Sequence, residues 1–174
     1  MEEKVKPMRE FVITTESNSD MDTAYLAEHG VGVIPHYYTI EDEMYGDGKE
    51  LTVKEFYDAM RAGKKAATMA SNPAVIRERF EEYAKQGKDI LHISFSSALS
   101  SGYENIVNGA NEIMEEYPEM KIIVIDTLSA SLGEGIVIRK AVQMKEEGKT
   151  IEEAAAWARE NCPHLNIQFT VDDL

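Results

Sequence analysis

Residues 89–103 read DILHISFSSALSSGY, and they contain the strand, loop and helix pattern on which the fold prediction rests. Residues 89–95 form an apolar run that predicts a buried strand, and five serines lie between Ser94 and Ser101. Residues 100–117 then predict a helix, because apolar side chains recur at helical spacing: Ile106, Ala110, Ile113 and Met114. A strand that passes through a short polar loop into a helix is the unit from which parallel sheets are built.

The rest of the chain repeats this unit on both sides. Further strands are predicted at residues 11–14, 31–40, 121–126 and 166–171, with a small hairpin at 43–45. Further helices are predicted at residues 21–28, 53–62, 73–86, 131–147 and 151–161. The alternation predicts an α/β fold, with a mostly parallel sheet and helices on both faces. The length of 174 residues suits one domain, residues 1–174.

Composition excludes several classes of function. The net charge of −14 argues against nucleic acid and against anionic membrane surfaces as partners. No run of about 18 apolar residues is present, so no membrane insertion is expected, and the N-terminal MEEKVKPMRE lacks the apolar core of a signal peptide. The single cysteine, Cys162, cannot form an internal disulfide, and we interpret it as an inert thiol at a helix end. Together these features predict a reducing, cytoplasmic setting.

The chain carries no recognisable cofactor or metal motif. The four histidines and Cys162 lack the spacing of zinc ligands. A Walker loop, a Gly-x-Gly-x-x-Gly turn and a Gly-x-Ser-x-Gly elbow are all absent from the sequence. His92 lies within an apolar strand and is predicted to be a core histidine instead of a base. With no nucleophile and base that can be paired, we expect a protein that is not an enzyme, with no cofactor and no metal.

In parallel sheets, ligands bind beyond the carboxyl ends of the strands. That rule selects the loops at 15–20, 96–102 and 127–135, and residues 68–72 are a fourth candidate because they lead into a helix. The serine cluster combines hydroxyls with free N–H groups at a helix start, which suits a carboxylate or a phosphate. Helix capping and tight turning are the alternative reason for serine there. Asp126 is predicted mainly to accept hydrogen bonds from loop amides.

Five motifs occur in the same order as in a known protein family. They are ITTESNSD at 13–20, YGDGKELT at 45–52 followed by EFY at 55–57, TMASNP at 68–73, FSSALSSGY at 95–103 and IDTLSASLGEG at 125–135. They resemble the family's I-V-T-D-S-T-A-D-L, Y-x-D-G-x-x-L-T-x-x-E-F-Y, T-S-x-x-N-P, I-S-S-x-L-S-G-T-Y and V-D-S/T-x-x-x-S-x-G-x-G. On these motifs, which span nearly the whole chain, the protein is identified as a member of the DegV family.

The resemblance implies a two-lobed α/β protein that buries a long-chain fatty acid between its lobes. The family holds the acyl carboxylate with a threonine and a serine that correspond to Thr68 and Ser100, and the neighbouring Ser97 is a third candidate. Some members present the acid to a fatty acid kinase, which phosphorylates the carboxylate. The resemblance therefore implies a lipid-binding protein with a fatty acid as ligand and a fatty acid kinase as partner.

The sequence departs from the family pattern at three places. Met69 replaces the usual serine beside Thr68, and Ser101-Gly102 stands where Gly-Thr is usual. Residue 174 falls where the family continues into a Gly-Gly-Arg segment and a C-terminal lobe, so this chain is expected to be the N-terminal lobe alone. It is then a fragment, which we favour, a lobe that pairs with a second copy as a homodimer, or a short relative with a changed role.

Two other functions are consistent with the residues. One is a phosphotransferase-like enzyme domain that uses the serine loop and Asp126, which would need a metal-binding carboxylate cluster or a phosphorylatable histidine beside that loop. The other is an interaction module without a ligand, which would expose an apolar patch.

Overall fold

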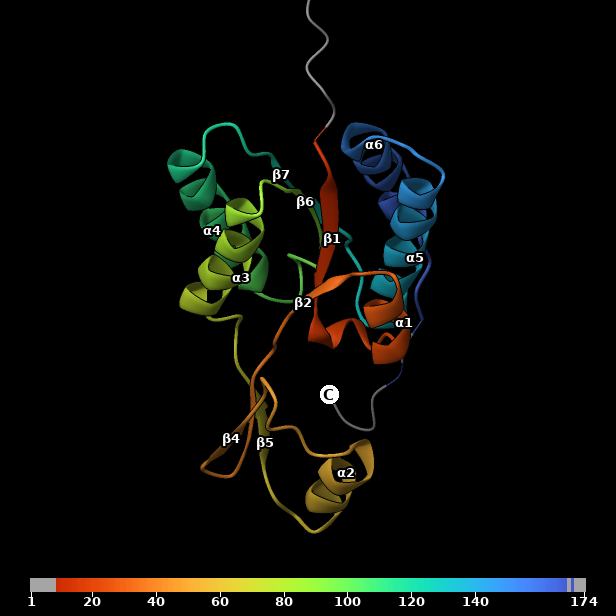
Figure 1. Cartoon of the computed structure of the whole chain (residues 1–174). Helices are drawn as coiled ribbons and strands as arrows, with labels where there is room; N and C mark the ends of the chain where they lie inside the picture. Colours follow the sequence, from red (N-terminus) through yellow and green to blue (C-terminus); the bar gives the residue numbers. More distant parts are fainter. Residues whose placement is uncertain (1–8, 169, 171–174) are drawn as a thin grey trace, which may run out of the picture.

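The computed structural model describes residues 9–168 and 170, and its centre is a four-stranded parallel sheet (Figure 1). The strand order is β2-β1-β6-β7, and every neighbouring pair is parallel. The strands are β1 (Phe11–Glu16), β2 (Gly32–Ile34), β6 (Asp89–Ser94) and β7 (Ile122–Asp126). The predicted α/β class with a mostly parallel sheet is confirmed.

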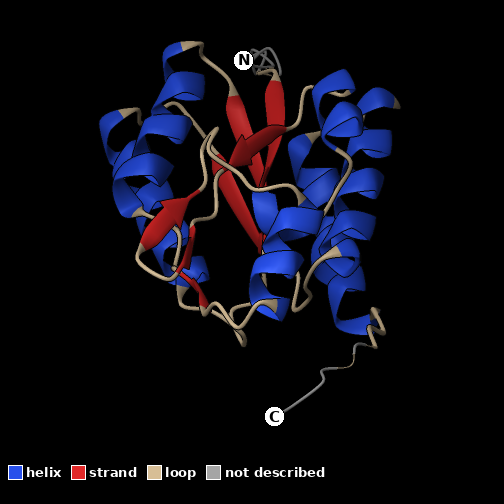
Figure 2. Ribbon diagram, turned by 90° about the horizontal axis from the view of Figure 1, so that it is seen from below, coloured by secondary structure: helices blue, strands red, loops and turns tan. Residues whose placement is uncertain are grey.

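Helices cover both faces of this sheet, as predicted (Figures 1 and 2). One face carries α3 (Pro73–Lys85) and α4 (Gly102–Glu116), and the other carries α5 (Leu132–Glu146) and α6 (Ile151–Asn161). The short α1 (Thr23–Glu28) packs on the same side as α5 through Leu26. Two short 3-10 helices are also present: η1 (Ser17–Ser19) and η2 (Cys162–His164).

The strand alternation divides the core into two layers. Val12 and Ile90 point toward α3 and α4, whereas Ile13 and Leu91 point toward α5 and α6. Because successive side chains of a strand point to opposite faces, a strand covered on both faces is mostly apolar on both of its sides. This explains the apolar run that marks β6 in the sequence, which His92 interrupts between Leu91 and Ile93.

A smaller antiparallel sheet lies at the end of the parallel sheet where β1 ends (Figure 1). Its order is β4-β3-β5, with β3 (Tyr38–Ile40), β4 (Glu43–Tyr45) and β5 (Ala66–Thr68). Helix α2 (Val53–Arg61) accompanies it and contacts β3 through the rings of Phe56 and Tyr38, whose centroids are 5.3 Å apart. The predicted 43–45 hairpin is confirmed as the pairing of β4 with β3.

The helix starts agree with the capping signals. Thr52 and Glu55 form a capping box at α2, and Thr150 forms the same arrangement with Glu153 at α6. Asn72 caps α3 by accepting a hydrogen bond from the N–H of Ala74 at 2.9 Å. These side chains satisfy N–H groups that a helix leaves without partners.

The single strand predicted at 31–40 is wrong, because Pro35 divides the segment. Residues before it form β2 in the parallel sheet, and residues after it form β3 in the antiparallel sheet. Proline has no N–H to donate and restricts the residue before it, so the ladder cannot continue. The next N–H, that of His36, donates instead to the Ser17 hydroxyl at 2.9 Å.

The predicted strand at 166–171 is also wrong over residues 166–168 and 170, which have no strand conformation; residues 169 and 171 lie outside the described part. The Ile167 side chain packs against Gly133 at the start of α5 instead of entering a sheet. Strand β5 carries no signal that we recognised in the sequence. Its three residues are all exposed, so it lacks the apolar pattern of a buried strand.

No helix in the described part of the chain has the length and apolar character needed to cross a bilayer.

Candidate functional site

The strand order places a topological switch point at the carboxyl ends of β1 and β6. From β1 the chain passes to β2 on one side and later returns to β6 on the other. Sheets of this kind bind ligands where the connections diverge in this way. Here the position lies between Glu16, the last residue of β1, and Ser94, the last residue of β6.

Glu16 fixes the start of the serine loop. Its buried carboxylate accepts hydrogen bonds from the Ser94 hydroxyl at 3.1 Å and from the Phe95 N–H at 3.3 Å. Burial by itself would raise the pKa of Glu16, but His92 and these donors outweigh it and lower the pKa below its ordinary value. Glu16 is therefore an ionised group at neutral pH, and it ties β1 to the loop that follows β6.

His92 is a core histidine, as predicted. It is completely buried, its Nδ1 lies 2.8 Å from Thr14 Oγ1, and its ring meets Phe80 edge-on. Its Nε2 lies 3.3 Å from a carboxylate oxygen of Glu16. The sequence did not indicate this contact between His92 and Glu16, which connects the centre of the sheet to the serine loop.

Asp126 joins the loop after β6 to the loop after β7, as predicted for a residue that bonds loop amides. One of its oxygens accepts the N–H groups of Ser97 at 3.2 Å and Leu128 at 3.0 Å. The other accepts the Ser97 hydroxyl at 2.5 Å. The Ser96 N–H donates to the Ser129 carbonyl at 3.0 Å and adds a second connection between the same loops.

The two candidate serines differ in what their hydroxyl hydrogens do. The exposed Ser97 donates its hydrogen to Asp126. The half-buried Ser100 uses its oxygen to accept the Gly102 N–H at 3.0 Å, which leaves its own hydrogen available to a ligand. Ser100 can therefore donate to an anion without losing an existing hydrogen bond, whereas Ser97 must first leave Asp126.

Thr68 is the exposed last residue of β5, and no hydrogen bond within the described residues joins it to Ser97 or Ser100. The segment that follows it nevertheless reaches the serine loop. The Ser71 carbonyl accepts a hydrogen bond from Asn105 of α4 at 3.0 Å, and the Ser71 side chain lies beside Gly102. The structure thus brings the fourth candidate segment to the start of α4.

Glu134 is a buried acid that the sequence reasoning missed. It lies in the first turn of α5, is fully buried, and accepts the Thr15 hydroxyl at 2.5 Å. Burial, with the nearby charge of Glu16, raises its pKa to about 9, so the carboxyl is neutral at pH 7. The only signal in the sequence is an acid between two glycines, Gly133 and Gly135, at a tightly packed helix start.

Large apolar side chains are exposed beside the hydroxyls in these loops. Met69, next to Thr68, is 44% exposed, and Leu99, next to Ser100, is 58% exposed. Leu128 and Leu132 in the loop after β7 are 54% and 62% exposed. The loops at the end of the sheet therefore present an amphiphilic surface, with hydrogen-bond donors adjoining apolar groups.

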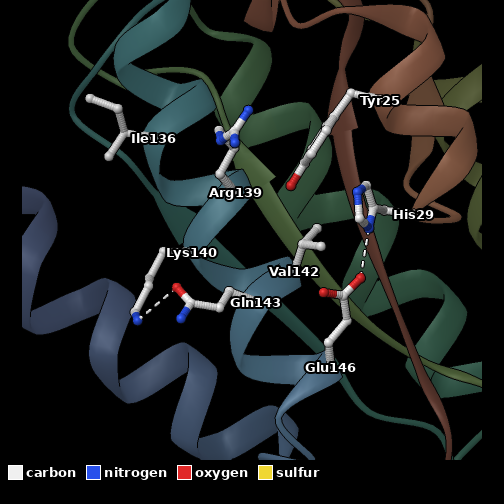
Figure 3. A pocket seen from close by; sticks show the side chains of 8 residues that line it. All are labelled: Tyr25, His29, Ile136, Arg139, Lys140, Val142, Gln143 and Glu146. Carbon is white, nitrogen blue, oxygen red and sulfur yellow. Dashed lines mark hydrogen bonds and ion pairs between the residues drawn. The ribbon is translucent and has the colours of Figure 1, made fainter.

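Two further features lie apart from these loops. A pocket of about 550 Å³ is bordered by α1 and α5, where Arg139 lies 4.8 Å from the Tyr25 ring and His29 pairs with Glu146 at 2.6 Å (Figure 3). It includes none of the predicted site residues. Cys162 is buried, which raises its pKa to about 11 and disfavours the reactive thiolate form.

Comparison with known proteins gives consistent results. The model of the DegV family, described as uncharacterised protein, matches residues 10–174. A DegV domain-containing protein of Clostridium perfringens is 38% identical over 169 residues, which are 96% of this chain and 58% of that protein. The chain thus spans little more than half the length of this curated relative.

Two solved structures share the fold. A Thermotoga maritima protein, described as revealing a fatty acid binding function, is 27% identical with a TM-score of 0.77, over 89% of this chain and 56% of its own. A DegV family protein of Ruminococcus gnavus, solved with vaccenic acid, is 26% identical with a TM-score of 0.77, over 87% and 54%. The match of the family model over nearly the whole chain, together with these similarities, shows that this chain belongs to the DegV family.

Proposed function

We propose that this protein binds a long-chain fatty acid and holds its carboxylate with Thr68, Ser100 and Ser97. The observation that carries the proposal is the pairing of hydroxyls with exposed apolar side chains at the end of the sheet: Thr68 adjoins Met69, and Ser100 adjoins Leu99. A ligand that matches this surface has a polar head and a long apolar body. The fatty acid binding described for the relatives supports the same ligand class.

The start of α4 is suited to the carboxylate. Helix N-termini carry a partial positive charge, which favours an anion. Ser100 lies at this N-terminus with a hydroxyl hydrogen that no acceptor in the described residues takes. Binding of this kind requires no nucleophile and no general base, so the proposed role is to hold the ligand without converting it.

The proposal extends to how the acyl chain is covered and what receives the acid. We infer that this chain is the N-terminal lobe of a two-lobed protein, whose second lobe covers Met69, Leu99 and Leu132. A second copy of the chain is the alternative cover. We further propose that a fatty acid kinase takes the acid from this site, and formation of an acyl phosphate from ATP and the loaded protein would test that step.

The proposed function is tested by ligand binding to the delipidated chain. Binding of palmitate is measured by native mass spectrometry and by titration for the unchanged chain and for Thr68→Ala combined with Ser100→Ala. We expect a bound fatty acid that is lost on denaturation, and affinity lowered at least about tenfold by the double substitution. Absence of binding to the unchanged chain contradicts fatty acid binding by this chain alone, and unchanged affinity of the double variant contradicts the site.

A further inference from the structure

Ser71 lies against the start of α4, with its hydroxyl and its backbone nitrogen close to Gly102. A methyl group placed on Gly102 would lie 3.2 Å from Ser100 Oγ, 3.5 Å from Ser71 Oγ and 3.8 Å from the Ser71 backbone nitrogen. These distances place two hydroxyls and a backbone nitrogen on one side of Gly102, the first residue of the helix, where no side chain separates them.

The donors of Ser71 have no partners in the described part of the chain. Its side chain is only 2% exposed, yet neither its hydroxyl nor its N–H forms a hydrogen bond there. Its carbonyl, by contrast, is held by Asn105 at 3.0 Å, which fixes the orientation of the residue. Ser71 Oγ is not among the fully buried side-chain atoms that lack a partner, so this hydroxyl keeps contact with the surface and a ligand can reach it.

Ser71 is not needed to cap a helix. The next residue, Asn72, is the N-cap of α3 and accepts the Ala74 N–H with its side chain. Capping explains most serines at such positions, but here that role is already filled. The hydroxyl of Ser71 is therefore available for another purpose.

Two helix N-termini meet at this point. Ser71 immediately precedes the cap of α3, and Gly102 begins α4. The helices pack side by side (Figure 1), and their approach is close enough that a side chain on Gly109 would lie 2.7 Å from Ile76 Cγ2. The positive ends of both helices thus act on the same small region, which favours an anion there.

We propose that Ser71 is a ligand-binding residue, whose hydroxyl and N–H bind the acyl carboxylate together with the Ser100 hydroxyl. This inference rests on the proposed fatty acid function and adds a residue to its site. A carboxylate offers two oxygens to these three donors. The ionised Glu16, whose carboxylate bonds the same serine loop, disfavours a second negative charge and so favours a carboxylate over a phosphate dianion.

The test compares an acid with a neutral lipid of the same chain length. Ser71→Ala is expected to weaken palmitate binding about tenfold and to leave hexadecanol binding unchanged, because only the acid has an ionised head group. The pKa of bound palmitate labelled with ¹³C at its carboxyl carbon should rise in this variant, since one donor to the ionised form is lost. A purely structural role would weaken both ligands alike.

Two further variants complete the experiment. Ser101→Ala is the matched control, because Ser101 is exposed and its side chain makes no capping hydrogen bond. Gly102→Ala places a methyl group where the donors converge and should abolish palmitate binding while the chain stays folded, since its φ lies outside the left-handed region.

The outcomes separate the inference from the function on which it rests. If the unchanged chain binds palmitate and Ser71→Ala binds it equally well with the same carboxyl pKa, the assignment of Ser71 is overturned and the proposed function stands. If the unchanged chain binds neither palmitate nor hexadecanol, both are overturned. Equal weakening of acid and alcohol in Ser71→Ala also overturns the assignment.

Discussion

The Thr15 hydroxyl donates a 2.5 Å hydrogen bond to the carboxyl group of Glu134, and both residues are completely buried. The bond joins the end of β1 to the first turn of α5. The second carboxyl oxygen of Glu134 has no partner within the described residues. This arrangement is compatible with a protonated acid and unfavourable for a carboxylate, in agreement with the pKa of about 9.

Glu134 makes stability fall as pH rises. Its pKa is about 9 in the folded chain and near the ordinary value of 4.5 in the unfolded chain, so the folded state holds the extra proton between these values. The free energy of unfolding should therefore decrease from pH 5 to pH 9, by at most roughly 1.4 kcal/mol per pH unit. Urea unfolding at several pH values measures this slope.

Glu134→Gln provides the comparison. The amide accepts from Thr15 as the protonated acid does, so the variant should match the unchanged chain near pH 5 and exceed its stability near pH 9. Other titrating groups, such as His36, cancel in the difference between the two proteins. Parallel stability profiles across this pH range would show that Glu134 is already ionised.

Glu16 should have the opposite effect on the pH dependence of the free energy of unfolding. Burial opposes its ionisation, but His92 and the loop donors hold its pKa below 4.5, so its contribution is present above that pH and lost as pH falls through the folded pKa. Glu16→Gln should lower the free energy of unfolding at pH 7 by about 1–3 kcal/mol, because the Phe95 N–H or the Ser94 hydroxyl loses its acceptor.

The measurement for Glu16 is chemical unfolding at pH 7 and in acid. The gap between Glu16→Gln and the unchanged chain should narrow below pH 4. Glu10→Gln is the control, because Glu10 is exposed and, within the described residues, forms an ion pair only with Lys88, at 3.4 Å, and surface pairs contribute less than about 1 kcal/mol. If Glu16→Gln is as stable as Glu10→Gln at pH 7, Glu16 does not hold the serine loop.

The close approach of α3 and α4 makes Gly109 sensitive to substitution. A Cβ atom there would lie 2.7 Å from Ile76 Cγ2, and Ile76 is completely buried. Gly109→Ala should destabilise the chain by about 1–3 kcal/mol, although alanine is the better helix former. Asn108→Ala, at an exposed position of the same helix, should not destabilise the chain. Thermal unfolding of the two variants measures the difference in stability.

Most of the fold follows from local patterns in the sequence. The apolar run of β6 and the capping boxes at Thr52 and Thr150 mark elements whose chemistry is contained within a few residues. The errors arise where position depends on distant contacts. Pro35 divides the strand predicted at 31–40 between two sheets. Ile167, in the strand predicted at 166–171, packs against Gly133 instead of pairing with another strand.

The candidate site divides in the same way. The participating loops could be predicted, because the carboxyl ends of parallel strands share one edge of the sheet. The contacts between the loops could not. Ser71 reads as one more residue of a turn, and its place beside Gly102 depends on the packing of α3 against α4. Nothing in the sequence assigned a role to Glu134 within the candidate loop 127–135, and only the fold buries it against Thr15.

Ser97 and Ser100 should contribute unequally to fatty acid binding. Ser97 already donates its hydroxyl hydrogen to Asp126 at 2.5 Å, whereas the hydrogen of Ser100 is available. A ligand gains little from Ser97, because each new hydrogen bond there replaces an existing one. Ser100→Ala should therefore weaken palmitate binding about tenfold, and Ser97→Ala should weaken it less, as measured by titration of the delipidated chain.

Asp126→Asn tests in a second way why Ser97 and Ser100 contribute unequally to fatty acid binding. The amide keeps one oxygen for the loop N–H groups but no longer presents a charged acceptor to Ser97, so Ser97 is released to the ligand and a nearby negative charge is removed. Palmitate affinity should then rise, and a subsequent Ser97→Ala substitution should cost more than it does beside Asp126. If Ser97→Ala costs as much as Ser100→Ala while Asp126 is intact, the carboxylate itself breaks the bond between Ser97 and Asp126, and Ser97 is a full member of the site.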